Sequence, residues 1–367
     1  MLQPLTTTQK MTISGHSEPI ILCAADDNYV KPLAVTLHSA ATHLRTNQSI
    51  KAIVLDGGIS EENWMRLKET FVDLPIEVFS IRPNLQEVKE LAISHHITHT
   101  AYFRLFAGRL LPDNIDKVIY LDSDLLIQDD LCQIWDEPLD DQLALAVPDV
   151  ACPFIDSRYA ECNFAKSSPY FASISPVGNW KELGLDPEDR YFNSGVMVLN
   201  IKRMREEFIG RQLLDCLRQN PKYVWCWDQY ALNVVFAKQW RTLPLKWNQG
   251  AHFFEYPDAD HAPVNNDEFL EARHRPSIVH YTTEWKPWDY DSSHPLKDRF
   301  FQQLDQTAWS GWRPEKPEFS IVSKWQAFAT EFVKQWVIHY RKIVSTIVPP
   351  RFTKPSSALS KITTTRV

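Results

Sequence analysis

The stretch from Pro19 to Asp27, PIILCAADD, decides the fold. Seven uncharged residues run into two adjacent aspartates, and apolar residues with helical spacing follow at Leu33, Leu37 and Ala40. The pattern predicts a buried strand, a loop and a helix. A strand without alternating polar residues is typical of a sheet that is covered on both faces.

The same unit recurs along the chain, which favours a parallel sheet. A second apolar run, 52–55, is followed by the turn Asp56-Gly57-Gly58 and by a helix that starts near Ser60, and a third strand is expected at 76–81. Further strands are predicted at 117–121, 145–148, 196–201 and 277–281, the last closing the sheet, and helices at 102–111, 202–217 and 227–237. Strands that alternate with helices predict an α/β protein with a Rossmann-like, mostly parallel central sheet and helices on both faces.

Charge and composition divide the chain into segments. The net charge is −7, but residues 311–367 hold ten Lys or Arg against three Glu. That tail carries +7, which leaves −14 for residues 1–310. We expect a disordered segment at 1–17, a catalytic domain at 18–310, a basic aromatic amphipathic helical extension at 311–350 and a disordered end at 351–367. The six cysteines form no CxxC pair, and no run of about 18 apolar residues occurs, so a cytoplasmic protein is expected.

Acidic and amide side chains follow two of the predicted strands at their carboxyl ends, where α/β sheets bind ligands. Asp26 and Asn28 follow the first strand, and Asp122-Ser123-Asp124 follows strand 117–121. Two aspartates separated by one residue can direct both carboxylates at one hard cation, and a divalent cation can neutralise a diphosphate. A solvated turn would have the same sequence, so the motif alone leaves both interpretations open.

The order of further motifs resembles that of glycosyltransferase family 8, the retaining enzymes that include glycogenin and bacterial lipopolysaccharide galactosyl- and glucosyltransferases. The blocks that carry the resemblance occur in family order between residues 19 and 290. They are Cys23–Tyr29, Val54–Ser60, Tyr102–Leu105, Lys117–Asp124, Tyr191–Val196, Asp228–Asn233, His280-Tyr281 and Lys286–Trp288. The resemblance implies a GT-A fold, a UDP-sugar donor and a divalent metal.

Carried over position by position, the resemblance implies a nucleotide site and a metal site. The metal ligands would be Asp122, Asp124 and His280, and a nitrogen ligand beside two carboxylates favours Mn²⁺ over Mg²⁺. The residues implied for the nucleotide are Ala24, Asp26, Asn28, Tyr29, Arg104, Asp122, Ser123 and Lys286. Alternatives for single residues are a helix cap for Asp26, a core ring for Tyr29, a surface arginine for Arg104 and a core histidine for His280.

The resemblance also implies a donor-sugar pocket made of Asp149, Asn193, Asp228 and Gln229, with Asp228 and Gln229 as catalytic residues. Because an amide is a poor nucleophile, we expect retention by front-face substitution, with the carbonyl of Gln229 facing the developing positive charge. A helix cap is the alternative for Asp228. The chain departs from the family pattern at Thr283, where relatives usually have glycine, and at Tyr230, where some have a second aspartate.

The expected partners are a UDP-glucose or UDP-galactose donor and a saccharide or glycolipid acceptor, with no nucleic acid. Residues 151–190 are rich in aromatic residues and are expected to flank the acceptor, although a packed subdomain would explain the same rings. The basic tail would suit an anionic membrane surface on the cytoplasmic side, or it could pack on the domain. A nucleotidyltransferase and a non-catalytic sugar- or nucleotide-binding module are the competing interpretations.

Overall fold

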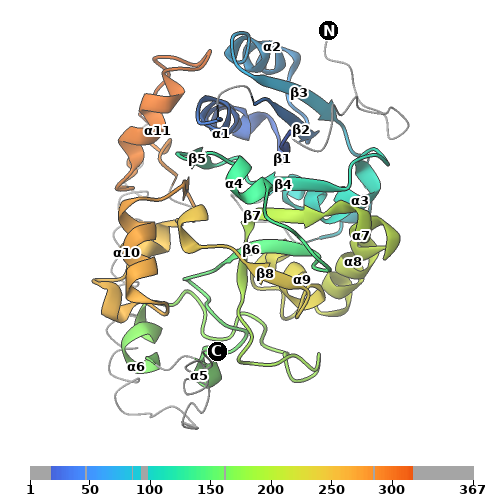
Figure 1. Cartoon of the computed structure of the whole chain (residues 1–367), viewed down its shortest axis with the longest axis vertical. Helices are drawn as coiled ribbons and strands as arrows, with labels where there is room; N and C mark the ends of the chain where they lie inside the picture. Colours follow the sequence, from blue (N-terminus) through green and yellow to red (C-terminus); the bar gives the residue numbers. More distant parts are fainter. Residues whose placement is uncertain are drawn as a thin grey trace, which may run out of the picture.

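A seven-stranded sheet with the order β3-β2-β1-β4-β7-β6-β8 forms the centre of the molecule (Figure 1). The computed structural model describes residues 18–316, except 46–47, 85, 92–97, 161–162 and 284–285. The segments predicted at 1–17, in 317–350 and at 351–367 therefore lie outside the described residues. The strands are β1 (Ile20–Ala25), β2 (Ile50–Asp56), β3 (Ile76–Ile81), β4 (Lys117–Leu121), β6 (Ala144–Pro148), β7 (Phe192–Asn200) and β8 (Trp240–Thr242).

The sheet is mostly parallel, as predicted. Strands β3, β2, β1 and β4 pair in parallel, and so do β6 and β8, whereas β7 is antiparallel to both of its neighbours. Because β7 runs the other way, its first residues lie at the edge where β4 and β6 end. Residues that follow β1, β4 and β6 therefore meet residues that begin β7.

The first strand–helix unit shows why the opening stretch decides the fold. Residues Ile21 and Leu22 of β1 are fully buried, and so is most of β2. Burying one such aliphatic side chain contributes about 1.5–3 kcal/mol. At the start of α2 (Glu61–Thr70), the Ser60 hydroxyl accepts a hydrogen bond from the backbone N–H of Asn63, which caps the helix as the sequence indicates.

Helices cover both faces of the sheet in two groups. On one side, α1 (Val30–Thr42) contacts α2 and α11 (Lys297–Leu304). The second group consists of the 3-10 helix η3 (His99–Phe106), α3 (Ala107–Leu110), α7 (Ile201–Glu206), α8 (Ile209–Gln219) and α9 (Trp227–Val235) (Figure 1). The short helices α4 (Cys132–Trp135), α5 (Ser157–Ala160) and α6 (Phe164–Ser167), and α10 (Asn266–His274), lie outside these groups.

Several predicted elements differ in detail, and the predicted helix 102–111 is the 3-10 helix η3 followed by α3. The predicted helix 202–217 is two helices, because the chain breaks at Phe208, whose φ of 53° is left-handed. The predicted strand 196–201 begins earlier, at Phe192, and ends at Asn200 because Ile201 starts α7. Local apolar spacing did not reveal the backbone reversal at an exposed phenylalanine.

The last predicted strand does not close the central sheet. Strand β9 (Ile278–His280) pairs antiparallel with β5 (Leu125–Ile127), and the two form a separate two-stranded sheet. Strand β5 begins one residue after Asp124. This small sheet therefore joins the segment after β4 to a segment about 155 residues later in the chain.

Candidate active site

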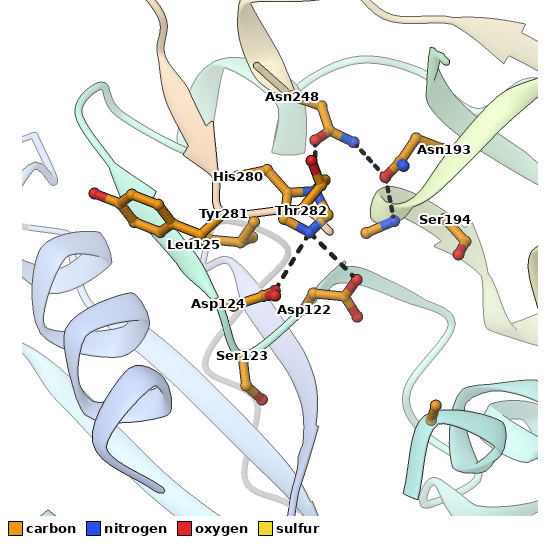
Figure 2. A network of polar contacts seen from close by, with 12 residues as sticks. Asp122, Ser123, Asp124, Leu125, Asn193, Ser194, Asn248, His280, Tyr281 and Thr282 are labelled. Atoms are coloured by element: carbon orange, nitrogen blue, oxygen red, sulfur yellow. Dashed lines mark hydrogen bonds and ion pairs between the residues drawn. The ribbon is translucent and has the colours of Figure 1, made fainter. Parts of the chain in front are cut away.

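Three potential metal ligands meet at the end of β4. Side-chain atoms of Asp122, Asp124 and His280 lie within 4.8 Å of one another. The His280 Nε2 atom is 3.3 Å from Asp124 Oδ1 and 3.7 Å from Asp122 Oδ2 (Figure 2). Two carboxylate oxygens and one imidazole nitrogen converge on one point, so this donor set fits a divalent cation. The solvated-turn alternative is excluded, because Asp124 and His280 are buried.

Pairing between β5 and β9 brings the histidine to the acids. In the register of the two strands, His280 lies opposite Leu125. The backbone N–H of Tyr281 also donates to the carbonyl oxygen of Asp124 at 3.0 Å. A shift of one residue would turn the imidazole to the other face of this sheet, so the register of the strand pair determines the metal site.

Two cations neutralise the acids of the cluster. The Arg104 guanidinium is buried, 2.7 Å from Asp122 Oδ1 and 3.1 Å from Asp228 Oδ2, and it lies over the Tyr120 ring. The surface-arginine alternative is therefore wrong. The Lys286 ammonium is 2.6 Å from Asp124 Oδ2. Burial opposes ionisation of Asp124, but Lys286 and then His280 hold the pKa of that carboxyl well below its usual range.

The backbone of β7 passes directly against the cluster at Gly195. A Cβ atom there would lie 2.3 Å from His280 Cε1 and 2.8 Å from Asp122 Oδ2. The carbonyl oxygen of Gly195 accepts a hydrogen bond from the backbone N–H of Asp122 at 2.9 Å. Glycine is therefore required here for close approach, and a side chain would displace two of the three candidate ligands.

Two cavities meet at the cluster. One has a volume of about 260 Å³ and the other about 100 Å³, and both are lined by Asp122 and Asp124 together with Arg104 and Lys286. The larger cavity contains all the residues predicted to hold a donor sugar, and the smaller one contains most of those predicted to hold a nucleoside. The shared wall, with its cations and acids, is the place where a diphosphate would join the two parts of a nucleotide sugar.

The smaller cavity, called here the nucleoside pocket, is lined by Ala24, Asp26, Tyr29 and Ser123. Thr98, which no motif signalled, also lines this pocket, and its hydroxyl donates to Asp26 Oδ2 at 3.0 Å. Asp26 also caps the turn that follows β1, since its Oδ1 accepts from the Asn28 N–H. Asn28 itself is exposed and does not line the pocket, and its nucleotide role stays a prediction.

Tyr29 serves as a wall between this pocket and the core. Its ring meets Trp288 edge to face, with centroids 5.9 Å apart. Burial, followed by the negative charges of Asp124 and Asp122, raises the pKa of the Tyr29 hydroxyl. Packing against the core and lining the pocket are therefore compatible for this residue.

The larger cavity, called here the sugar pocket, is braced by a break in the β6–β7 ladder. The register shifts from Ala146 opposite Met197 to Val147 opposite Asn193. Side chains satisfy the backbone groups that this irregularity releases. The Ser194 N–H donates to Gln229 Oε1 at 3.0 Å, and the Gly195 N–H donates to Asn193 Oδ1 at 3.0 Å.

Carboxylates complete the sugar pocket. Asp149 Oδ2 accepts from Gln229 Nε2 at 3.0 Å and from Asn193 Nδ2 at 3.3 Å. Asp228 lies in the first turn of α9, where Cys226 is the capping residue, so the cap alternative for Asp228 is wrong. Burial raises the pKa of Asp228 to about 6, against the lowering effect of Arg104, and the negative charge of Asp122 adds to the increase.

The sugar pocket also has polar and aromatic lining residues that no motif signalled, among them Trp225, Asn248, His252 and Thr282. Trp225 is 48% exposed, and an exposed indole at a pocket was not signalled by any periodicity. Thr283 also lines the pocket and has a φ of 74°, a conformation that favours glycine. The chain therefore keeps the backbone geometry of a glycine at the position where the residue differs from the family pattern.

The predicted acceptor-side region, 151–190, contributes three residues to the lining of the sugar pocket. Ala151, Cys152 and Ala172 line that cavity, and the segment folds into α5, α6 and a 3-10 turn. Trp247 is buried in the core and does not line this cavity. In the described part of the chain, no helix is long and apolar enough to span a bilayer.

Comparisons with known proteins agree with this geometry. A model of the family described as Glycosyl transferase family 8 matches residues 20–292. General stress protein A of Bacillus subtilis (strain 168) is 28% identical over 299 residues, 79% of this chain and 94% of that protein. Lipopolysaccharide 1,2-glucosyltransferase of Escherichia coli (strain K12) is 23% identical over 302 residues, 82% of this chain and 81% of that protein.

Among solved structures, galactosyltransferase LgtC in complex with donor and acceptor sugar analogs matches with a TM-score of 0.64 and 24% identity. The match covers 81% of this chain and 98% of that one. At this level of identity the similarity shows the fold, and it confirms the GT-A architecture that the sequence predicts.

Proposed function

The chain belongs to glycosyl transferase family 8 and is a glycosyltransferase, and we propose that it transfers glucose or galactose from a UDP-sugar to a hydroxyl of a saccharide or glycolipid. The observation that carries the proposal is the convergence of Asp122, Asp124 and His280 at the wall shared by two cavities. Family membership also decides against a nucleotidyltransferase and against a non-catalytic module as the competing functions.

We assign a divalent cation, Mn²⁺ or Mg²⁺, to the three converging side chains. The nitrogen ligand from His280 favours Mn²⁺, because Mg²⁺ prefers oxygen ligands throughout. A bound divalent cation would act as a Lewis acid that offsets charge on the diphosphate. Arg104 pairs with Asp122, and Lys286 pairs with Asp124. These buried cationic groups support a diphosphate beside the metal, because its oxygens can share them.

The two pockets divide the donor between them. In the nucleoside pocket, Asp26 and Ser123 offer polar groups for uracil and ribose, and Tyr29 offers a ring against which a base can pack. In the sugar pocket, Asp149 and Asn193 offer acceptors and a donor to hexose hydroxyls. The nucleoside of the donor would therefore lie in one pocket, its hexose in the other, and its diphosphate at the wall that the two pockets share.

We propose that the reaction retains the anomeric configuration by substitution on the front face of the sugar. The bond between the anomeric carbon and the phosphate oxygen breaks, the acceptor oxygen bonds to the same face, and the acceptor proton passes to the leaving phosphate. The Gln229 amide is held by Ser194 and Asp149, which supports a role in positioning and charge stabilisation. Tyr230 is buried and its hydroxyl donates to Asn179, so it provides no nucleophile.

The acceptor would enter the open side of the sugar pocket, past Trp225 and His252. An exposed indole suits a sugar ring, since aromatic faces bury its apolar surface. Similarity to a lipopolysaccharide glucosyltransferase supports a saccharide or glycolipid acceptor. We further propose that the basic tail after residue 316 binds an anionic membrane surface and holds the enzyme as a peripheral protein on the cytoplasmic side.

The central test is release of UDP from a series of UDP-sugars in the presence of Mn²⁺. Release should require UDP-glucose or UDP-galactose and should increase with added saccharide acceptor. Asp124→Ala should lower the rate by about 1,000-fold or more, because it removes a metal ligand and the partner of Lys286. No release from either donor, or an unchanged rate in the variant, would refute the proposed function.

The membrane proposal has its own test. The full chain should float with liposomes that contain anionic lipids at low salt, and a chain that ends at residue 316 should not. Floating of both forms to the same extent would refute a role for the tail while leaving the proposed reaction intact.

A further inference from the structure

A chain of hydrogen-bonded amides connects the candidate metal site to the sugar pocket, and the buried residue Asn248 lies between the two. We propose that Asn248 is a positioning residue: it holds His280 in the tautomer that presents Nε2 to the metal, and it ties that imidazole to the residues that hold the sugar. This inference rests on the proposed metal site. Figure 2 shows Asn248 between His280 and Asn193.

The orientation of the first amide follows from a backbone donor. The Gly195 N–H points at Asn193 and lies 3.0 Å from its Oδ1 atom. A backbone N–H can only donate, so the Asn193 atom that faces it is the carbonyl oxygen. Asn193 Nδ2 is then free to donate to Asp149 Oδ2, 3.3 Å away.

The second amide is oriented by the first. The same Asn193 oxygen lies 2.9 Å from an amide atom of Asn248, which must be the donor Nδ2. The opposite end of the Asn248 amide is therefore Oδ1, and it lies 2.8 Å from His280 Nδ1. A carbonyl oxygen can only accept, so the hydrogen in this contact belongs to His280 Nδ1.

The orientation of the Asn248 amide determines the tautomer of His280. With hydrogen on Nδ1, a neutral imidazole has its lone pair on Nε2, the atom that faces Asp122 and Asp124. A metal ligand needs that lone pair, and the group bonded to the other ring nitrogen commonly fixes the ring in place. Asn248 therefore performs for this histidine the task that a carboxylate or a backbone carbonyl performs in many metal sites.

The position of Asn248 is itself well determined. The residue is 5% exposed and follows the 3-10 turn η5 (Leu245–Trp247). The next residue, Gln249, exchanges backbone hydrogen bonds with β9: its N–H donates to Ile278, and its carbonyl accepts from the His280 N–H. The backbone thus places Asn248 and His280 side by side, and only the amide side chain remains to be oriented.

The chain of contacts continues to the proposed catalytic amide. Asn193 and Gln229 both donate to Asp149 Oδ2, and Gln229 Oε1 accepts from the Ser194 N–H. The donor and acceptor ends of each amide along this path are assigned. If one amide were reversed, its NH₂ group would face a donor, or its oxygen would face an acceptor, in the next residue. Asn248 is the step that connects the metal side to the sugar side.

Two substitutions separate the two contacts of Asn248. In Asn248→Asp, a carboxylate oxygen can still accept from His280 Nδ1–H, but no donor remains for Asn193. In Asn248→Leu, which has a similar volume, both contacts are lost. Gln249→Leu is the matched control, because it removes a neighbouring buried amide that donates to the Arg273 carbonyl and does not face the site.

The first measurement is the affinity for Mn²⁺, determined by electron paramagnetic resonance with and without UDP. Asn248→Leu should weaken binding by about 10- to 100-fold, the usual effect of losing a partner of a metal-bound histidine. Asn248→Asp and Gln249→Leu should bind within about threefold of the unmodified protein. In Asn248→Asp, kcat should nevertheless fall by about tenfold, because Asn193 loses its donor.

The second measurement is the tautomer itself. In protein with ¹⁵N-labelled histidine that is saturated with Mg²⁺ and UDP, so that Nε2 faces the cation rather than two free carboxylates, His280 should give the Nδ1–H pattern, assigned by its loss in His280→Gln. That pattern should persist in Asn248→Asp and change in Asn248→Leu. If Asn248→Leu does not fold, an Nε2–H pattern in the unmodified protein or in Asn248→Asp would still overturn the inference.

The results distinguish this inference from the proposed function. If the unmodified protein binds no Mn²⁺ in the presence of UDP, the metal site itself is wrong. If it binds Mn²⁺ and Asn248→Leu binds equally well with an unchanged His280 pattern, only the role of Asn248 is wrong.

Discussion

The nucleoside pocket and the sugar pocket share one wall, yet their polar groups are held differently. In the nucleoside pocket, Asp26 bonds to Asn28 within its own turn and to Thr98, 72 residues later in the chain. In the sugar pocket, Asp149, Asn193 and Gln229 come from three elements and hold one another. Tertiary contacts hold both pockets, but the side chains of the sugar pocket also bond to one another. Because this mutual bonding preorganises them, substitutions there should affect catalysis more than nucleotide binding.

The largest effect predicted from this comparison is on folding stability, because the sugar pocket buries the carboxyl of Asp228. Burial raises the pKa of Asp228 to about 6, well above the usual range of an aspartate. The folded state therefore holds this proton more tightly than the unfolded chain does, and stability should fall as the pH rises from about 4 to about 6, by up to about 3 kcal/mol. Asp228→Asn should remove that loss.

The measurement is chemical unfolding of both proteins at pH 4.5 and at pH 7. The stability of Asp228→Asn relative to the unmodified protein should increase between these two values. If the two proteins differed in free energy of unfolding by the same amount at both pH values, ionisation of Asp228 would not destabilise the fold. Burial of this carboxyl would then not distinguish the sugar pocket from the nucleoside pocket.

The second prediction tests whether the braces of the sugar pocket act in catalysis. Gln229→Ala leaves the Ser194 N–H without its acceptor and Asp149 without one of its donors. The kcat should fall by about 100-fold, as for loss of one preorganised polar group, while the dissociation constant of UDP changes by less than about threefold. Equal losses in both quantities would contradict the division between the pockets.

The converse substitution belongs to the nucleoside pocket. Asp26→Asn keeps an oxygen for the Asn28 N–H but removes the charge next to Thr98. UDP binding, measured by calorimetry, should weaken by about tenfold, the value of one hydrogen bond to a charged group. The kcat at saturating donor should stay within about threefold, and a larger loss of kcat would show that the two pockets are coupled at this residue.

The smallest effect is expected at Thr283, at the edge of the sugar pocket. A β-branched residue at a φ of 74° is strained by about 1–2 kcal/mol. Thr283→Gly should therefore stabilise the protein by about 0.5–1 kcal/mol after the greater freedom of glycine in the unfolded chain is counted. Thr283→Ala, which keeps a Cβ atom, should not. Equal stability of the two variants in thermal unfolding would argue against backbone strain.

The sequence alone determined the parts of the molecule that depend on neighbours along the chain. The apolar run before Asp26 had to be a buried strand, and Asp122 and Asp124 had to emerge together, because the residue spacing of one strand end decides both. The resemblance in motif order then identified His280, Arg104 and Lys286, and the structure brings all three to the aspartates.

Only the tertiary structure decided how these groups are held. The register of β5 with β9 aims the imidazole, and the irregular pairing of β6 with β7 releases the N–H groups that orient Asn193 and Gln229. No pattern along the chain signalled Asn248, because its role depends on the direction of an amide between two distant residues. Hydrogen bonds are directional and join groups that folding brings together, whereas apolar periodicity reports only which side of an element is buried.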